Sequence, residues 1–344
     1  RKDEDEAVKW FKLAAKNGSV YAQYKLGLLH ESGVIPNAKP GDAKMWYNKA
    51  AAQGHAKAKL ALARYYDTAS GSTLDKQKAA DLYHSVAYQG NAFAQYKLAN
   101  MYKDGVGVKK DLTQAHSLYL KSAKNGNHNA QNQLGLMYLN GTGVKPDLQN
   151  SIVWLTQSAN NGNSNAQFEL AKLYQTGKGV KQNYDKARKW YEKAALQGHR
   201  QAQYELASIY HLGLGTPSNF TQSAYWHEKA AKKGHKIAQF KLALMYNSGI
   251  GVEKNLNKAF NLFLKAAKQG DVNSQYHVGL MYFKGIGITK NYKEAFHWLQ
   301  KAAKKGNKLA KYYLGIMYEN GYGVTKDPRK AYNLYLNSTN NEKK

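Results

Sequence analysis

Apolar and small residues recur along this chain at the spacing of helices that each bury one face. In one segment they are separated by steps of three and four residues, which is the spacing of a single helical stripe. Its members are Ala187, Trp190, Tyr191, Ala194 and Ala195. A second stripe follows directly and consists of Ala202, Leu206, Ala207 and Tyr210. The pattern predicts two short amphipathic helices in succession.

This pair of helices repeats with a period of 36 residues from one end of the chain to the other. The most regular marker is a glycine after the first helix, found at Gly18, Gly54, Gly90, Gly126, Gly162, Gly198, Gly234, Gly270 and Gly306. An alanine stands three residues before each of these glycines. Because no insertion breaks the register, the sequence predicts nine helix-turn-helix repeats, each burying its apolar face against its neighbours.

The residues at the turns are those that end and begin helices. A glycine such as Gly198 can adopt the left-handed conformation that closes a helix. The residue after it is Ser, Asn or Asp in six of the nine units and histidine in the other three, at His55, His199 and His235. Ser, Asn and Asp are good N-caps, so we expect the second helix to begin there, with the histidines in the same capping role. A Gly-x-Gly pair ends the second helix in seven units.

One position of the first helix carries a large apolar side chain in every unit. It is tryptophan at Trp10, Trp46, Trp154, Trp190, Trp226 and Trp298, and leucine at Leu82, Leu118, Leu262 and Leu334. This recurrence predicts that these side chains lie in the core. Small residues on the second helices, such as Gly135, Ala171 and Ala207, are expected to let neighbouring helices approach closely.

The consensus of the repeat is similar to that of the Sel1-like repeat family, a relative of the tetratricopeptide repeat. It reads Ala-x-x-Trp/Leu-Tyr-x-x-Ala-Ala-x-x-Gly-Asn/His-x-x-Ala-Gln-Tyr-x-Leu-Gly/Ala-x-x-Tyr-x-x-Gly-x-Gly-Val and covers essentially the whole chain. The resemblance implies an all-α fold, a right-handed α-solenoid superhelix of about nine helix-turn-helix repeats with a C-terminal capping helix. It also implies an adaptor or scaffold that binds other proteins on a curved surface. Known members include bacterial periplasmic or secreted proteins, some of which act on host cells.

We expect one solenoid over residues 1–344, divided by regularity into irregular N-terminal repeats at 1–74, regular repeats at 75–324, and a capping helix with a polar tail at 325–344. In the first unit, Pro36 and Pro40 follow where later units carry Gly-x-Gly-Val, and His30 replaces a recurring tyrosine. Terminal repeats are usually atypical because one of their faces meets solvent.

At the other end, Asp327 and Pro328 are expected to open the capping helix, since proline is tolerated in a first helical turn. Residues 340–344 are expected to fray.

The amino-acid composition excludes several kinds of chemistry but does not identify the cellular compartment. The chain has no cysteine, which excludes disulfides, thiolate nucleophiles and thiolate metal sites. It contains no apolar run of the roughly 20 residues that span a bilayer. No leader peptide is visible, but the sequence begins at Arg1 without a methionine, so that observation carries no information on localisation. The family resemblance favours a periplasmic or secreted bacterial protein.

The charge is strongly positive, with a formal net charge of +28. It concentrates in the last third of the chain, where 22 Lys and Arg stand against 6 Asp and Glu from residue 229 onward. Lysines recur at two positions of successive first helices, Lys229, Lys265 and Lys301 at one and Lys232, Lys268 and Lys304 at the other. Stacking would align them in two basic rows. Two interpretations remain open: stabilisation of the last helical turn and of solubility, or an anion-binding face.

Apolar residues at positions that the core pattern leaves outside are candidates for partner binding. They are Tyr88, Leu120, Leu196, Tyr225 and Leu264. In related solenoids the first helices line the concave side, and by that analogy these residues belong to a groove.

Signals of catalysis or cofactor binding are missing. The capping histidines lie one or more repeats apart, too far to share a metal, and the Gly-x-Gly pairs follow helices, whereas a nucleotide-binding glycine loop follows a strand. The acidic residues form no paired arrangement. We therefore expect a protein that is not an enzyme and has no cofactor.

Two functions remain. The first is an adaptor that holds a segment of another protein in the groove, and we expect that segment to be acidic to match the lysines. The alternative is binding of an anionic ligand through the basic C-terminal repeats, either acidic phospholipid, cell-wall glycan or nucleic acid. Nucleic acid is disfavoured because most of the 27 tyrosines lie at periodic positions that packing requires.

Overall fold

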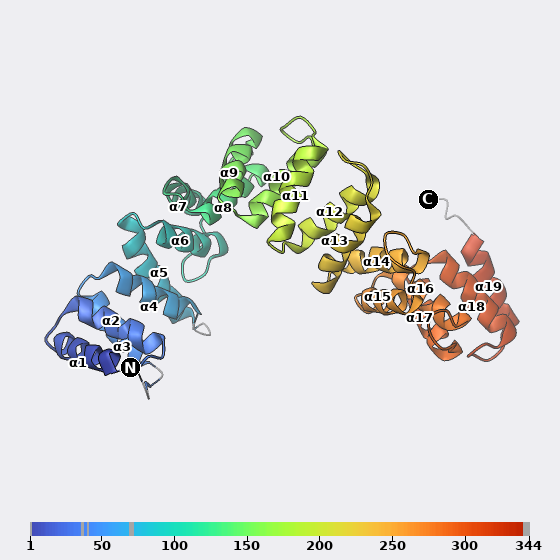
Figure 1. Cartoon of the computed structure of the whole chain (residues 1–344), viewed down its shortest axis with the longest axis horizontal. Helices are drawn as coiled ribbons and strands as arrows, with labels where there is room; N and C mark the ends of the chain where they lie inside the picture. Colours follow the sequence, from blue (N-terminus) through green and yellow to red (C-terminus); the bar gives the residue numbers. More distant parts are fainter. Residues whose placement is uncertain (1, 36–37, 40, 69–71, 340–344) are drawn as a thin grey trace. The chain divides into compact units, whose positions relative to one another are not determined.

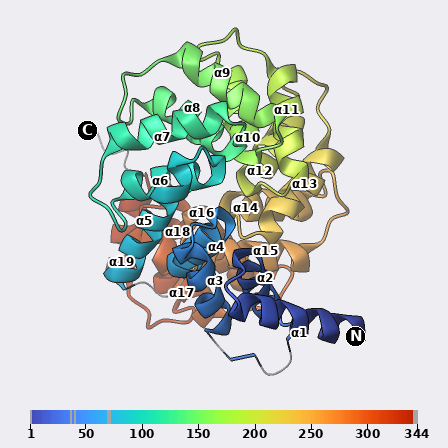
Figure 2. The same cartoon turned by 90° about the vertical axis from the view of Figure 1, so that its left-hand side faces the viewer.

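The computed structural model describes residues 2–35, 38–39, 41–68 and 72–339, and the side chains of residues 2–5 lie outside the description. Within these ranges the chain forms nineteen α-helices and no strand. It divides into two compact units, Arg1–Ala166 and Gln167–Lys344, and the boundary falls inside α10 (Ser164–Thr176). Within each unit, helices that follow one another in sequence pack side by side (Figures 1 and 2). Each unit is therefore built as an α-solenoid.

Unit 1 contains nine helices before α10. They are α1 (Lys2–Lys16), α2 (Val20–Glu31), α3 (Asp42–Ala52), α4 (Ala56–Thr68), α5 (Thr73–Tyr88), α6 (Ala92–Asp104), α7 (Leu112–Lys124), α8 (His128–Asn140) and α9 (Leu148–Asn160). Odd-numbered helices are the first helices of the predicted repeats, and even-numbered helices are the second.

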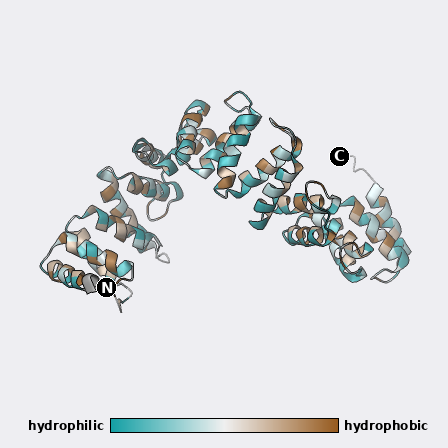
Figure 3. Cartoon of the chain, viewed as in Figure 1, coloured by the Kyte–Doolittle hydropathy of each residue, from teal (hydrophilic) through white to brown (hydrophobic). Residues whose placement is uncertain are grey.

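Unit 2 continues the same alternation after α10. Its helices are α11 (Tyr184–Leu196), α12 (Arg200–Leu212), α13 (Phe220–Lys232), α14 (Lys236–Ser248), α15 (Leu256–Lys268), α16 (Val272–Lys284), α17 (Tyr292–Lys304), α18 (Lys308–Asn320) and α19 (Pro328–Thr339). Hydrophobic and hydrophilic residues alternate along the individual helices, as an amphipathic pattern requires (Figure 3). Among the described helices, none is both long and apolar enough to cross a membrane.

The predicted turn chemistry is confirmed. Asn91 and Asp271 cap their helices through side-chain oxygens that accept backbone N–H bonds. The histidines do the same through a ring nitrogen, as Nδ1 of His199 accepts from the N–H of Ala202 at 3.1 Å. Gly198, which follows the first helix, has a φ of 84°. The predicted helix ends therefore lie where the structure has them.

Successive repeats are held together by a column of buried glutamines, whose structural role the sequence pattern did not reveal. The amide nitrogen of Gln239 donates to the carbonyl oxygen of Ala231 at 3.1 Å, and its amide oxygen accepts from Gln269 of the next repeat at 2.8 Å. Gln95 makes the equivalent pair of bonds in unit 1, to Ala87 and from Asn125. Since a buried unpaired carbonyl is costly, these two glutamines each satisfy the end of one helix and link it to the following repeat, whereas, among the described residues, Gln203 and Gln275 form only the bond within their own repeat.

The small residues allow the close helix packing that was predicted. A Cβ atom added at Gly135 would lie 2.7 Å from Cγ of Leu155, so that any side chain there would displace α9 from α8. At the end of the chain, α19 packs on α18 through the buried Ala331 and through Leu334. The hydroxyl of Ser151 donates to the Gly135 carbonyl oxygen at 2.8 Å. The close approach of α8 and α9 thus depends both on the missing side chain at Gly135 and on this hydrogen bond.

One core prediction was wrong. Trp10 is 65% exposed, whereas Trp46, Trp226 and Trp298 are buried. The buried indoles pack against the helices of the preceding repeat, as Trp226 does against the core around α12. Among the described residues no helix precedes α1, so Trp10 has no such surface to cover. The predicted irregularities at Pro36 and Pro40, and the tail at 340–344, lie outside the described residues.

Candidate partner-binding surface

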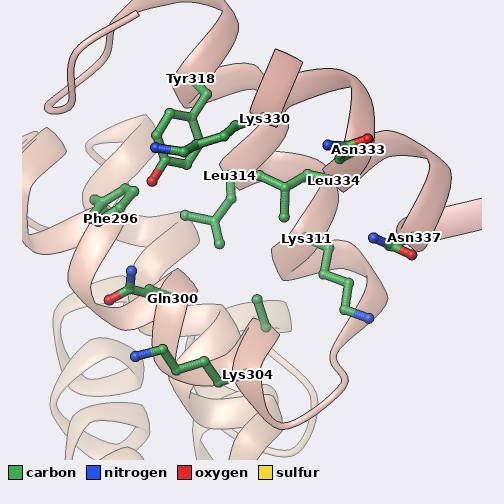
Figure 4. Close-up of a pocket in the computed structure, with 11 residues that line it drawn as sticks. Phe296, Gln300, Lys304, Lys311, Leu314, Tyr318, Lys330, Asn333, Leu334 and Asn337 are labelled. Carbon is green, nitrogen blue, oxygen red and sulfur yellow. The ribbon is translucent and has the colours of Figure 1, made fainter. Parts of the chain in front are cut away.

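A cavity of about 350 Å³ opens between α17 and α19 above α18. Leu314 and Leu334 point toward one another in its middle, and lysines lie around its edge (Figure 4). The apolar and aromatic part of the lining is Phe296, Ala303, Leu314, Tyr318 and Leu334, and the polar part is Gln300, Lys304, Lys311, Lys330, Asn333 and Asn337. Among these lining residues there are three cations and no carboxylate. The cavity therefore combines an apolar floor with a positive rim.

An equivalent cavity of about 250 Å³ lies two repeats earlier, between α13 and α15 above α14. Its lining is Glu228, Ala231, Lys232, Leu242, Tyr246, Lys258, Asn261, Leu262 and Lys265. Most of these positions correspond to those of the first cavity at a spacing of 72 residues. Three lysines again surround an apolar floor, but Glu228 is present and forms an ion pair with Lys232 at 2.8 Å. Its positive rim is therefore weaker.

Unit 1 has a third cavity at the same repeat position, between α5 and α7 above α6. It measures only about 140 Å³, and Tyr88 stands where Lys232 and Lys304 stand in unit 2. Its rim carries a single lysine, Lys121. A further cavity of about 410 Å³, between α2 and α4, is formed elsewhere on the repeat and shares none of these positions. The position between successive first helices is therefore a recurring hollow.

The two predicted lysine rows are exposed and occupy the last turns of α13, α15 and α17. Lys229 and Lys301 lie over aromatic rings, with Nζ 5.2 Å from the Tyr225 centroid and 4.6 Å from that of Trp298. The Glu228 carboxylate holds the pKa of Lys232 above its ordinary value. These three ammonium groups have local partners that explain their placement.

The other three lysines of the rows, Lys265, Lys268 and Lys304, form no ion pair within the part of the chain that the structure describes. Lys232 and Lys265 belong to the rim of one cavity, and Lys304 belongs to the rim of the other. We call the surface that carries the six lysines and the two cavities, on α13, α15, α17 and α19, the basic face.

The predicted apolar candidates fall into two groups. Tyr88, Leu196 and Tyr225 are exposed, at 90%, 71% and 46%. Leu120 and Leu264 were expected outside the core pattern, but each is partly buried and packs against a core cluster. Their position on the helix faces the neighbouring first helix, where a leucine finds apolar contacts. They are thus structural residues at least in part, and of the five candidates Tyr88 alone lines one of the four cavities described above.

Histidines form no metal site among the described residues. One of them has a role that the capping interpretation missed. His227 is 2% exposed and stands at the core position held by Tyr191 and Phe263 in other repeats, a correspondence that the repeat register could have revealed. Burial lowers the pKa of His227 to about 3, with smaller contributions from His211, Lys241 and His235.

The comparisons with known proteins agree with this architecture. A family model described as Sel1 repeat matches ten consecutive segments, residues 1–19, 20–55, 56–91, 92–127, 128–163, 164–199, 200–235, 236–271, 272–307 and 308–340. Each full match pairs a second helix with the first helix that follows, so ten matches and nine repeats with a final helix describe the same nineteen helices. No curated protein sequence matches the chain.

Two solved structures are similar over most of the chain. One is c5321, a protective antigen present in uropathogenic Escherichia coli strains that displays an SLR fold. It is 34% identical with a TM-score of 0.81, and the alignment covers 98% of this chain and 72% of that chain. The other is a Sel1 repeat protein from Oxalobacter formigenes, 30% identical with a TM-score of 0.69, with 90% of each chain covered.

Proposed function

Because the chain belongs to the Sel1 repeat family, whose members are generally scaffolds for protein–protein interactions, we propose that it binds an acidic segment of another protein on the basic face. The observation that carries this proposal is the pair of cavities in unit 2, each with an apolar floor and three lysines around it. Apolar contacts in such hollows supply affinity, and the charges supply steering and orientation. Repeats of this kind are typically non-enzymatic.

The charge distribution supports an acidic partner. From residue 229 onward basic residues exceed acidic ones by 16, and Lys265, Lys268 and Lys304 have no carboxylate partner among the described residues. A lysine in a last helical turn interacts favourably with the helix dipole, which explains one per helix without any ligand. That contribution does not explain why lysines also surround the cavities from α18, as Lys311 does, and from the start of the next first helix, as Lys258 and Lys330 do.

The experiment compares two charge-reversed proteins as bait for cell extract. Lys268→Glu with Lys304→Glu changes the basic face. Lys16→Glu with Lys124→Glu makes the same change at the same repeat position in unit 1, where both lysines are also exposed. We expect wild type and the unit 1 variant to retain a common protein that the basic-face variant loses at least about tenfold, because attraction becomes repulsion. Equal retention by all three proteins would contradict the proposal.

Salt separates protein binding from binding to a polyanion. A segment anchored by apolar contacts should weaken only slightly between low and moderate ionic strength, whereas binding to nucleic acid or another polyanion should fall steeply as counterions compete. Duplex DNA, vesicles containing acidic phospholipid, and cell-wall glycan serve as the comparison ligands. Tight, steeply salt-dependent binding to one of them, without a retained protein, would favour the polyanion function in its place.

A role in host interaction is a finer proposal. Its support is the description of the relative from uropathogenic Escherichia coli as a protective antigen, which is a statement about that protein. We propose that this chain is likewise exported from a bacterial cell. Cell fractionation and antibody labelling of intact cells test this, and recovery of the protein only in the cytoplasmic fraction would contradict it.

A further inference from the structure

One position of the first helices is tryptophan in some repeats and leucine in others, and each of the three equivalent cavities is lined by this position of the first helix that follows it. Trp226 and Trp298 are buried at 6% and 7% exposure. The indole of Trp298 packs in one core cluster with Ala267, Val278 and the partly buried Tyr282. The indole of Trp226 packs in another with Ala195, Leu206 and the partly buried Tyr210. Each tryptophan thus covers a floor of alanine, an aliphatic residue and tyrosine.

The same floor lies open where the position is leucine. Ala303, Leu314 and Tyr318 line the cavity beside Leu334. Ala231, Leu242 and Tyr246 line the cavity beside Leu262. Three of the four leucines at this position, Leu118, Leu262 and Leu334, line a cavity. A leucine side chain is smaller than an indole, so the cavities are the spaces that tryptophan fills in the neighbouring repeats.

The cavities in unit 2 differ from that in unit 1 in size and charge. The one beside Leu334, at about 350 Å³, falls within the range of about 300–1,000 Å³ that is typical of ligand sites; the one beside Leu262, at about 250 Å³, lies just below it, and the one beside Leu118, at about 140 Å³, far below it. The rim beside Leu334 holds Lys304, Lys311 and Lys330. Lys330 has a partner of its own, Asp327 at 3.4 Å, which leaves the other two without an ion pair among the described residues.

Lys311 is also unusual within the repeat. Most other repeats carry a buried glutamine at this position, such as Gln239, which bridges neighbouring repeats. At Lys311 a cation on the cavity wall takes the place of that structural residue. Lysines beside an aromatic-sized apolar hollow can contact both the face of a bound ring and a carboxylate next to it.

We infer that the cavities beside Leu262 and Leu334 are sockets that each accept an aromatic side chain, indole above all, from a partner segment with carboxylates next to the aromatic residue. The inference rests on the proposed function and specifies what that partner carries. The socket beside Leu334 is the stronger of the two, because it is larger and its lining contains no carboxylate. One lysine of each socket has an ion-pair partner, Lys330 with Asp327 and Lys232 with Glu228. The bound aromatic side chain occupies the space that Trp226 and Trp298 fill in the repeats before and between the two sockets.

The test uses a defined probe, the tripeptide N-acetyl-Asp-Trp-Asp-amide, titrated into full-length protein with ¹³C-labelled leucine methyl groups. We expect the methyl signals of Leu314 and Leu334 to shift, followed by those of Leu242 and Leu262 at higher concentration. Two control peptides carry Ala in place of Trp or Asn in place of both Asp, and each should bind at least about tenfold more weakly, equivalent to about 1.4 kcal/mol. Unchanged methyl signals at millimolar tripeptide would overturn the inference, as would equal binding of the controls.

Filling one socket from within gives a site-specific variant. Leu334→Trp should abolish the shift at Leu314 and leave the shift at Leu242 unchanged. The fold should tolerate the substitution because Trp298 stands at the same position one repeat earlier. The double variant Lys311→Gln with Lys304→Gln leaves the apolar floor unchanged and places at position 311 the glutamine that most repeats carry there. It should weaken tripeptide binding about tenfold. Unaltered binding in both variants would overturn the inference.

The two proposals fail in different ways. If a lysine-dependent partner is captured equally well by wild type and by the double variant Leu262→Trp with Leu334→Trp, the sockets are wrong and the scaffold function stands. If capture does not depend on Lys268 and Lys304, the proposed function is wrong whatever the tripeptide does.

Discussion

At the scale of single residues, polar side chains inside the helix stacks decide how the repeats stay in register. Most of the buried glutamines, such as Gln239, join a helix carbonyl of their own repeat to an amide of the next. A buried hydrogen bond of this kind adds about 1 kcal/mol net, but leaving either partner unsatisfied costs more. His227 is the opposite case: it occupies a core position, and its Nδ1 has no hydrogen-bond partner among the described residues. Its contribution to stability therefore depends on remaining neutral.

The depressed pKa of His227 predicts acid sensitivity of unit 2. In the unfolded chain the imidazole takes up a proton near pH 6.5, whereas in the folded protein it does so only near pH 3. Between these values the unfolded state binds the additional proton, so the free energy of unfolding falls as the pH falls. By pH 5 the loss from this one group is about 2 kcal/mol.

The variant His227→Phe removes this contribution, and Phe263 shows that the position accepts phenylalanine. Urea unfolding of both proteins at pH 7 and pH 5 measures the difference. We expect the wild type to lose about 2 kcal/mol more than the variant on acidification, because the other histidines are common to both. Equal losses would show that the side chain is protonated in the folded protein or reaches solvent.

At the scale of the helical elements, the turns fix where each helix stops. Two turn glycines share a left-handed backbone conformation but differ in how closely other atoms approach them. Both have a positive φ, +72° at Gly251 and +89° at Gly306. A Cβ atom at Gly251 would lie 2.3 Å from the carbonyl oxygen of Phe220, while one at Gly306 would meet nothing within 4 Å. The turn after the second helix is therefore held against the previous first helix, and the turn within a repeat is free in space.

Alanine at these two positions tests that distinction. Gly306→Ala should lose about 1–2 kcal/mol, the cost of placing an ordinary residue in the left-handed region. Gly251→Ala carries the same cost and must also displace α13, so we expect a loss of more than about 3 kcal/mol. Thermal unfolding of the two variants, both in unit 2, gives the comparison. Equal losses would mean that the contact with Phe220 can relax at no cost.

The sequence allowed prediction of the helices, their caps and their period, because these depend on local patterns that repeat nine times. It did not allow prediction of how deeply a given position is covered. Trp10 shares its repeat position with the buried Trp226 yet is exposed, since burial there depends on a preceding repeat. Leu264 reads as an outward residue but contacts the neighbouring repeat. In the sequence, the sockets appear only as leucines at a position that is tryptophan in most repeats. Whether the smaller side chain leaves a cavity, or neighbouring residues fill the space, depends on packing.

At the scale of the whole molecule, the features that suit a ligand are unevenly distributed between the two units. Unit 2 holds the basic face and two lysine-rimmed sockets, and unit 1 holds a smaller equivalent with one lysine on its rim. A repeat protein can vary such positions independently, because each repeat contacts mainly its neighbours. The chain therefore contains the candidate site in unit 2 and, in unit 1, an equivalent cavity that serves as a control in binding experiments.

A partner segment that binds the basic face by placing aromatic side chains where tryptophan is missing should be excluded when tryptophan is restored there. The most direct measurement is the affinity of the lysine-dependent partner for wild type, for Leu262→Trp with Leu334→Trp, and for Leu118→Trp, which fills the unit 1 cavity by the same substitution. We expect a loss of at least about tenfold for the double variant and unchanged affinity for Leu118→Trp. Undiminished affinity of a folded double variant, or an equal loss in Leu118→Trp, would contradict this mode of binding.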